Sequence, residues 1–195
     1  MHGDIEASSD WSGIATAEPA EGTANPAGLL TLGRVTRRDA DDLIRANRAN
    51  ISRHRPWFHP FVDEGGFLNW FQGGLSGPHA NLIAREAATG AVVGVVNIEN
   101  IVCGAFWCAN LSYYGMAGFE GRGFMTAAVR LALLYGFGQL DLHRIEAAVQ
   151  PPNTRSRALL QRLGFRLEGI SPEYLMIDGA WRDHERWALL RREYR

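Results

Sequence analysis

The stretch GFEGRGFMTAAVRLALLYGF, residues 118–137, sets three glycines at spacings of three and two and then becomes an apolar, alanine-rich run. Glycine lets the backbone bend and approach a ligand closely, and the start of a helix presents N–H groups that have no partner in the helix. A glycine loop that leads into a helix is a common binding place for phosphate. The stretch therefore predicts that residues 121–125 hold a phosphate group.

Three interpretations of this loop compete. A Walker A loop needs a lysine after its glycines, and all 20 basic residues of this chain are arginines. A dinucleotide fingerprint would use Gly121 and Gly123, but Thr126 occupies its third glycine position, and Asp141 precedes the next strand instead of ending it. A glycine turn that merely starts a helix stays open from the loop alone.

The segments around the loop alternate between strand and helix patterns. We predict strands over 28–35, 105–115, 143–149 and 165–170, two antiparallel strands over 80–102, and a hairpin over 173–190 around Asp178-Gly179. Helices are predicted over 36–54, 63–75, 124–137 and 153–163. This order predicts one mixed α/β domain with a long central sheet.

Composition limits the classes of function. Five acidic and no basic residues fall within 1–28, a segment rich in Ala, Gly, Ser, Thr and Pro, which predicts a flexible acidic N-terminal tail before a domain at 29–195. The net charge of −1 gives no reason to expect binding to nucleic acid. The sequence contains no run of about 18 apolar residues, so we expect no membrane span. Cys103 and Cys108 match neither a disulfide framework nor a zinc site, so we expect a cytoplasmic protein without a metal.

The order strand, glycine loop, apolar helix, strand, Asn-capped helix and strand resembles the acetyl-CoA core of the GCN5-related N-acetyltransferases (GNAT). In that family a Gln/Arg-x-x-Gly-x-Gly/Ala loop holds the pyrophosphate of coenzyme A on backbone amides. Here the loop reads Gly118-Phe-Glu-Gly121-Arg-Gly123, which keeps both glycines and lacks the leading Gln or Arg. The resemblance implies an α/β GNAT fold whose mixed, mostly antiparallel sheet is splayed at the acetyl-CoA site, with helices on both faces.

Segments 98–129, 142–147, 153–169 and 173–189 are similar to the RimJ branch of the RimJ/RimL subfamily, most specifically at IDGAWRDH, residues 177–184. Bacterial members of that branch acetylate protein N-termini, with the alanine terminus of ribosomal protein S5 as the named substrate. The resemblance implies a monomeric or homodimeric enzyme that transfers acetyl directly from acetyl-CoA to the α-amino group of a ribosomal-type protein N-terminus. Acetylation of a small amine (an antibiotic, polyamine or amino acid) and a non-catalytic acyl-CoA-binding module remain open.

The resemblance also implies which residues hold acetyl-CoA. Backbone amides at 111–113 would polarise the thioester carbonyl as an oxyanion hole does, and the glycine loop would hold the pyrophosphate. The predicted set is Leu111, Ser112, Tyr113, Phe119, Glu120, Gly121, Arg122, Gly123, Phe124, Met125, Thr126, Asn153, Ser156 and Arg157.

The leaving thiolate needs a proton. Many relatives supply it from a tyrosine seven residues after the helix-capping asparagine, but counting from Asn153 gives Leu160. The subfamily instead suggests Ser156, three residues after Asn153, as the catalytic hydroxyl. An ordinary serine in the first turn of a helix is the competing interpretation of Ser156.

The acceptor side is harder to assign. A protein α-amine is partly neutral near pH 7.5, so its need for a base is modest. Glu99 is the first candidate for that base, with two rival acids at 173 and 183, and Asn110 stands where many relatives have Glu and would bind the amine or a water. Trp57, Phe58 and Tyr174 are predicted to frame a slot for an extended peptide end, although core packing explains Phe58 equally well.

Overall fold

The structure is a computed structural model that describes residues 23–24 and 28–194. Its described strands form one sheet in the order β1-β2-β3-β4-β5-β6-β8-β7. They are β1 (Thr23–Ala24), β2 (Leu30–Arg34), β3 (Ala80–Glu86), β4 (Val92–Val102), β5 (Cys108–Gly115), β6 (Arg144–Val149), β7 (Arg166–Ile177) and β8 (Ala180–Leu190). β5 and β6 run parallel, while the other neighbours run antiparallel. This confirms the mixed, mostly antiparallel sheet expected from the sequence.

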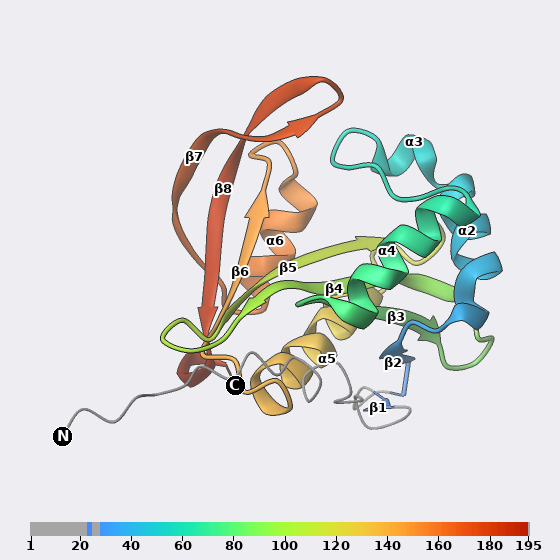
Figure 1. The fold of residues 1–195 in the computed structure, drawn as a ribbon, viewed down its shortest axis with the longest axis horizontal. Coiled ribbons are helices and arrows are strands. Elements are labelled where there is room, and N and C mark those ends of the chain that lie inside the picture. The colour runs from blue at the N-terminus through green and yellow to red at the C-terminus, as the bar shows by residue number, and fades with distance from the viewer. Residues whose placement is uncertain (1–22, 25–27, 195) are drawn as a thin grey trace.

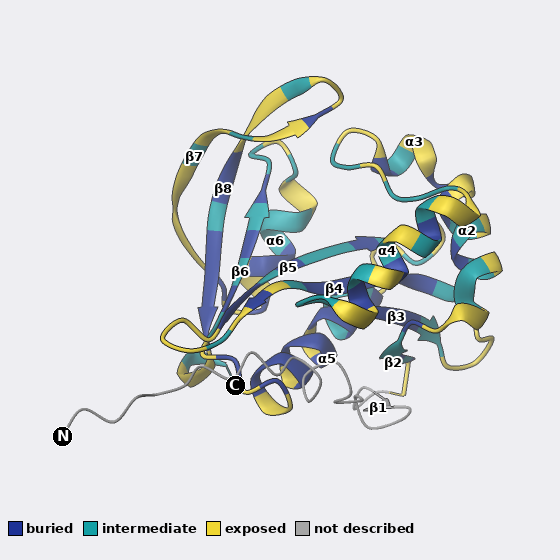
Figure 2. Cartoon of the chain, in the orientation of Figure 1, coloured by how far each residue is buried: buried dark blue, intermediate teal, exposed yellow. Residues whose placement is uncertain are grey.

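Helices cover both faces of the sheet, as predicted (Figure 1). They are η1 (Arg37–Asp39), α2 (Ala40–Ala49), α3 (Ile51–His54), α4 (Glu64–Ser76), α5 (Phe124–Gly138), α6 (Thr154–Arg162) and η2 (Arg191–Glu193). Apolar side chains of α5 and α6 share one core cluster on one face, and those of α2 and α4 share a second cluster on the other. Burying these two apolar layers is the main force that holds the sheet in place. Figure 2 shows the middle strands and α5 as largely buried, whereas much of the edge strand β7 is exposed.

The helix predicted over 36–54 divides into η1, α2 and α3. The Thr36 backbone N–H and hydroxyl both donate to Asp39 at 2.8 Å, which fixes the start. Asn50 separates α2 from α3, because its side-chain amide donates to the Ala46 carbonyl and its side-chain oxygen accepts from the Ala117 N–H. These bonds compete with regular helical bonding and tie α2 to the loop before α5.

The separate strands predicted over 165–170 and 173–177 are one long strand, β7. Its pairing with β8 continues on both sides of a register shift between Ser171 and Leu175. Glu173 lies within this shift at a positive φ of 47°, and its N–H donates to the Asp183 carboxylate at 2.8 Å. The bulge interrupts the alternating sequence pattern, but the strand pairs with β8 on both sides of it. The sequence therefore predicted two strands where the structure has one.

The sheet opens between β5 and β6. Their register contains only three pairs, from Cys108 with Arg144 to Asn110 with Glu146. Beyond these pairs the two strands diverge, as Figure 1 shows at the centre of the molecule. The splay predicted at the acetyl-CoA site is therefore present.

Most of the predicted tail, 1–28, lies outside the described residues, and the domain boundary after residue 28 stays a prediction. Thr23 and Ala24 pair with Leu32 and Thr31 of β2, so the described sheet takes in two residues assigned to the tail. Among the described helices, none combines the length and hydropathy that crossing a bilayer requires.

Candidate active site

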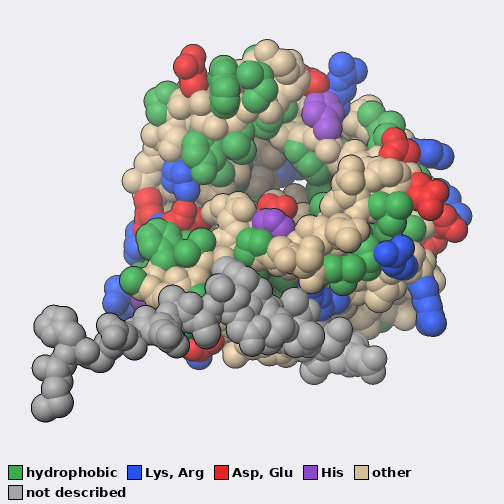
Figure 3. All heavy atoms as spheres, in the orientation of Figure 1, with side chains coloured by type: hydrophobic (Ala, Val, Ile, Leu, Met, Phe, Trp, Pro, Cys, Tyr) green, Lys and Arg blue, Asp and Glu red, His purple; other side chains and the backbone are tan. Residues whose placement is uncertain are grey.

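A cavity of about 710 Å³ lies where β5 and β6 diverge, and Figure 3 shows a hollow in the centre of this face. It brings together eight of the predicted site residues, while the predicted glycine-loop residues 119–126 are not among its lining residues. Its lining comes from the loop after α3, from α4, from the divergent strands and the start of α6, and from the β7–β8 hairpin. The predicted residues that line it are Trp57, Phe58, Glu99, Leu111, Ser112, Tyr113, Asn153 and Ser156.

The start of α5 presents backbone donors. Gly123 precedes the helix at φ 81°, and the first helical bond runs from the Ala127 N–H to the Gly123 carbonyl at 3.0 Å. The N–H groups of residues 124–126 thus lack helical partners, and no side chain caps them. A Cβ placed on Gly121 or Gly123 would meet nothing within 4 Å, so the loop leaves open space above its backbone. This geometry suits an anion held on amides, as the glycine spacing predicted.

The side chains of the loop are engaged elsewhere. Phe119 and Phe124 pack edge to face with centroids 5.2 Å apart, and the Arg122 guanidinium lies over the Phe124 ring at 4.7 Å. Glu120 accepts from the Gly118 N–H at 2.7 Å and pairs with Arg53 at 2.5 Å. Hydrogen bonds from the loop backbone and Arg53 hold the pKa of Glu120 below its usual value. The loop therefore offers mainly backbone to a ligand, and Arg122 is its exposed cation.

Of the three predicted amides on β5, those of Leu111 and Tyr113 point away from β4, and that of Tyr113 lies farther beyond the last pair with β6. The Met116 N–H donates to the Val93 carbonyl at 2.8 Å, and bonding alternates along an antiparallel ladder. Because alternate residues of β5 bond to β4, the backbone N–H of Ser112 faces β4, as that of Met116 does. The backbone N–H of Tyr113 faces away from β4. β6 has already diverged at this point, so the Tyr113 amide has no β6 partner in the ladder. It faces the cavity that Tyr113 lines, as an oxyanion donor would.

Ser156 lies beside the phenol of Tyr113. Their oxygens are 2.7 Å apart, and the phenol also lies 3.3 Å from the Ser156 carbonyl oxygen. Burial raises the pKa of Tyr113 to about 12, so the phenol keeps its proton near neutral pH. The sequence identified Ser156 but not this partner, because strand and helix are 43 positions apart. The pair places two hydroxyl groups among the residues that line the cavity.

Two further predicted coenzyme residues have structural partners. Asn153 caps α6, with its side-chain oxygen accepting from the Ser156 N–H at 3.2 Å. The Arg157 guanidinium lies 2.9 Å from the Glu185 carboxylate of β8. Arg157 therefore joins α6 to the sheet, while Asn153 lines the cavity.

The acceptor side of the cavity carries one carboxylate among its described lining residues, that of Glu99. The Glu99 carboxylate has no hydrogen bond or ion pair with any other described residue. Two residues along β4, Asn97 is buried, and its amide nitrogen donates to the Ser112 hydroxyl at 3.1 Å while its oxygen is sealed without a partner. The unpaired Glu99 carboxylate favours a ligand that carries N–H donors. Asn110, opposite Glu99 in the ladder, is not among the lining residues.

Two of the three residues predicted to form the aromatic slot, Trp57 and Phe58, line the cavity. Trp57 and Phe58 line the cavity on a loop that Gln150 of the β6 end holds through the carbonyls of Pro56 and Trp57, at 3.2 and 3.4 Å. The same loop meets the hairpin turn, where Asp178 pairs with His59 at 2.7 Å and with Arg55 at 3.5 Å. These contacts join the loop to the hairpin turn, so that the two together cover the acceptor side of the cavity.

Tyr174 lies behind the lining and not in it. Its ring packs on His184 with centroids 5.7 Å apart, under the Arg186 guanidinium at 4.6 Å. His184 does line the cavity and was missed from the sequence. The sequence signal that could have identified His184 is its position in the IDGAWRDH stretch. Only the three-dimensional structure shows that its side chain reaches the cavity.

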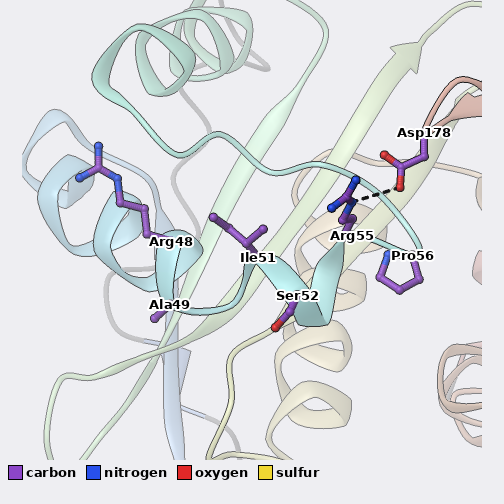
Figure 4. A pocket seen from close by; sticks show the side chains of 7 residues that line it. All are labelled: Arg48, Ala49, Ile51, Ser52, Arg55, Pro56 and Asp178. Carbon is purple, nitrogen blue, oxygen red and sulfur yellow. Dashed lines mark ion pairs between the residues drawn. The ribbon is translucent and has the colours of Figure 1, made fainter.

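A second hollow of about 560 Å³ lies on the outer side of α3 (Figure 4). Its lining holds the Arg55–Asp178 pair and otherwise small or apolar residues with Arg48, whose guanidinium donates to the Val62 carbonyl. It contains neither a nucleophile beside a base nor any predicted site residue. We therefore place the candidate active site in the larger cavity.

Neither cysteine takes part in that cavity. Burial raises the pKa of the Cys108 thiol to about 11, and burial also raises that of Cys103. Both thiols are protonated near neutral pH and poor nucleophiles. Within the described residues, no group of three or more His, Cys, Asp and Glu is placed to hold a metal ion.

Comparison with known proteins agrees with this architecture. Residues 30–166 match the acetyltransferase (GNAT) domain family. The chain is 43% identical over 98 residues to the [ribosomal protein uS5]-alanine N-acetyltransferase of Escherichia coli, covering half of each protein, and 30% identical over 76 residues to the spermidine N(1)-acetyltransferase of the same species, covering 39% of this chain and 41% of that enzyme. The chain thus spans about half the length of the curated relatives it matches.

A solved structure extends the likeness. Mycobacterium smegmatis RimJ in complex with CoA-disulfide superposes with a TM-score of 0.77 at 33% identity, covering 86% of this chain and 84% of that one. The splayed sheet, the glycine loop at α5 and the matched domain lead to one conclusion: the chain belongs to the GNAT acetyltransferase family.

Proposed function

We propose that this chain transfers the acetyl group of acetyl-CoA directly to the α-amino group of a protein N-terminus. The observation that carries the proposal is the single cavity in which Ser156, the Tyr113 amide and the unpaired Glu99 carboxylate meet. Acetyl-CoA supplies an activated acyl group with a thiol leaving group. The chain must bind it, orient an amine and handle one proton on each side.

The loop and splay fit coenzyme A. Free amides at residues 124–126 and the open space over Gly121 and Gly123 suit its pyrophosphate. The Tyr113 amide would polarise the thioester carbonyl, and Asn153 would contact the pantetheine arm. The Ser156 hydroxyl, hydrogen-bonded to Tyr113, would donate to the departing sulfur.

The acceptor side fits one amine at the end of an extended chain. Glu99 would attract the ammonium form of that amine. Trp57 and Phe58 would cover the first residues of the peptide. The E. coli relative named for alanine acetylation of uS5 supports this class of acceptor.

Polyamine acetylation is the second candidate, supported by the similarity to the spermidine enzyme. A polyamine carries several positive charges, and the described lining offers Glu99 as its sole carboxylate. Each unmatched ammonium group would lose hydration without gaining a partner. The charge of the cavity therefore favours a monoamine terminus.

Thiol release from acetyl-CoA tests the proposal. We expect turnover with an alanine-terminated peptide, and kcat/KM at least about tenfold lower with spermidine or with the same peptide blocked at its N-terminus. A higher kcat/KM for spermidine would replace the proposed acceptor class. Binding of acetyl-CoA without thiol release with any amine would identify a non-catalytic module.

A further inference from the structure

We propose that His184 is the general base of this reaction, with its Nε2 taking the proton that the acceptor amine loses. The inference rests on the acetyl transfer proposed above and names the residue that handles the acceptor's proton. His184 is 3% exposed and lines the cavity from β8.

The hydrogen bonding of the ring fixes its orientation and tautomer. Nδ1 lies 2.9 Å from the Arg182 carbonyl oxygen, and a carbonyl only accepts, so Nδ1 carries the hydrogen. The neutral ring then has its lone pair on Nε2. Nε2 has no described partner, and it is not among the described polar atoms that are both unpaired and sealed from solvent. It therefore opens to the cavity that the ring lines.

The sheet places this ring on the acceptor face. Successive side chains of a strand point to opposite faces. Glu185 pairs with Arg157 of α6, on the coenzyme face, so its neighbour His184 projects to the other face. That face carries α2, α4 and the loop of Trp57 and Phe58. An amine entering past this loop would meet Nε2 opposite the Ser156 side of the cavity.

The rival acids are less suited to the role. Asp183 accepts the Glu173 N–H at 2.8 Å within the β7 bulge, both residues are exposed, and neither lines the cavity. Glu99 does line it, but an unpaired carboxylate is suited to holding the charged ammonium form of the acceptor. A histidine ring nitrogen with a free lone pair is the most common general base in enzymes. Glu99 is therefore assigned to binding the ammonium group.

The groups packed around the ring hold it in place. Tyr174 of β7 lies against it, with Arg186 stacked over the far side of the tyrosine. The titratable groups that share the cavity are His59 of the loop after α3, Glu99 of β4, and Tyr113 and Tyr114 of β5. Burial raises the pKa of both tyrosines well above neutral, so they stay uncharged near neutral pH.

The proton balance closes. The bound ammonium group first releases one proton to solvent. The neutral amine nitrogen then forms the new C–N bond as the C–S bond of the thioester breaks, and the nitrogen loses its second proton to His184 Nε2. The sulfur takes one proton from the Ser156 hydroxyl, which solvent replaces. His184 then returns its proton to solvent, leaving an amide and a thiol.

The test is the pH dependence of kcat/KM in His184→Asn, whose amide nitrogen can still donate to the Arg182 carbonyl but cannot act as a base. We expect about a 100-fold loss near pH 7. On the acid side of the profile, the slope of log kcat/KM against pH should fall from about two, for base and amine together, to about one. Coenzyme A affinity should be unchanged. The matched control is His54→Gln, which alters the other buried histidine of the described chain and should keep the wild-type profile.

A wild-type slope and rate in His184→Asn with an alanine-terminated peptide would overturn the role of His184 and leave the proposed function standing. Absence of transfer by the wild-type chain would instead remove the proposed function. If His184→Asn does not fold, the ring carbon resonance of His184 in the wild-type chain decides. It must titrate at the pH of the kinetic acid limb, and a resonance that stays constant across that limb contradicts the proposal.

Discussion

The two sides of the proposed site are built from different chemical groups. The proposed coenzyme side uses backbone: the free amides at the start of α5 and the open space over Gly123, which lie outside the lining of the cavity, and the Tyr113 amide at the splay. The acceptor side uses side chains from four separate elements, including Trp57, Glu99 and His184. Backbone groups are positioned by local conformation, whereas these side chains meet only through the order of the strands. Substitutions on one side should therefore leave the other side's binding intact.

Gly123→Val should produce the largest effect on the coenzyme side. A β-branched residue at φ 81° is strained, and its side chain would enter the space left for the ligand. Losing two charge-assisted hydrogen bonds of about 1.5 kcal/mol each predicts about a 100-fold higher Kd for coenzyme A by calorimetry. Gly90→Val is the matched control, because Gly90 has a similar φ of 73° and open surroundings at the β3–β4 turn. Unchanged affinity in folded Gly123→Val would disprove the loop assignment.

Ser156→Ala should lower kcat about tenfold, or about 1.4 kcal/mol, with coenzyme A affinity nearly unchanged. The hydroxyl assists a thiolate that already leaves easily, so the loss stays at the low end for acid catalysis. Thr154→Ala, an exposed position in the same helical turn, serves as the control. Single-turnover kinetics measures the chemical step, and a wild-type rate there would make Ser156 a structural residue.

Asp178→Asn should act on the acceptor side alone. It removes the ion pairs of the hairpin turn with Arg55 and His59, shown in part in Figure 4. Such exposed pairs contribute about 0–1 kcal/mol, so the acceptor KM should rise no more than about fivefold and coenzyme A affinity should not change. Asp141→Asn, which breaks the exposed pair with Arg191 elsewhere, is the control. A change in coenzyme A affinity would contradict the separation of the two sides.

His54→Gln should have the smallest effect, on stability and not on either ligand. Burial lowers the pKa of His54, whose Nε2 donates to the Gly115 carbonyl at 3.1 Å while Nδ1 is sealed without a partner. Below the ordinary value of 6.5 the unfolded chain therefore binds the proton first, and stability falls as pH falls. Glutamine keeps the donor and cannot titrate. Urea unfolding at pH 5.5 and 7.5 should show a pH difference smaller by up to about 1 kcal/mol in the variant.

The same contrast explains what the sequence could predict. Glycine spacing, the Asn153 cap and strand patterns predicted the starts of α5 and α6 and the mixed sheet, because these signals are local. The Tyr113 phenol and His184 were missed, because their roles depend on partners far along the chain. Tyr174 was placed in the slot but supports His184 from behind, since the bulge in β7 sets its direction. Contacts between side chains far apart in the sequence depend on the order of the strands, which a single sequence does not reveal.

The most direct test of the account is to locate the acetyl group on a peptide that begins with alanine and carries an internal lysine. The cavity's single lining carboxylate and closed acceptor side predict that fragmentation mass spectrometry will find the acetyl group on the N-terminal nitrogen. The lysine side chain should remain free under conditions of complete turnover. Acetyl on the lysine, with a free N-terminus, would contradict the central claim that this site is built for an α-amine.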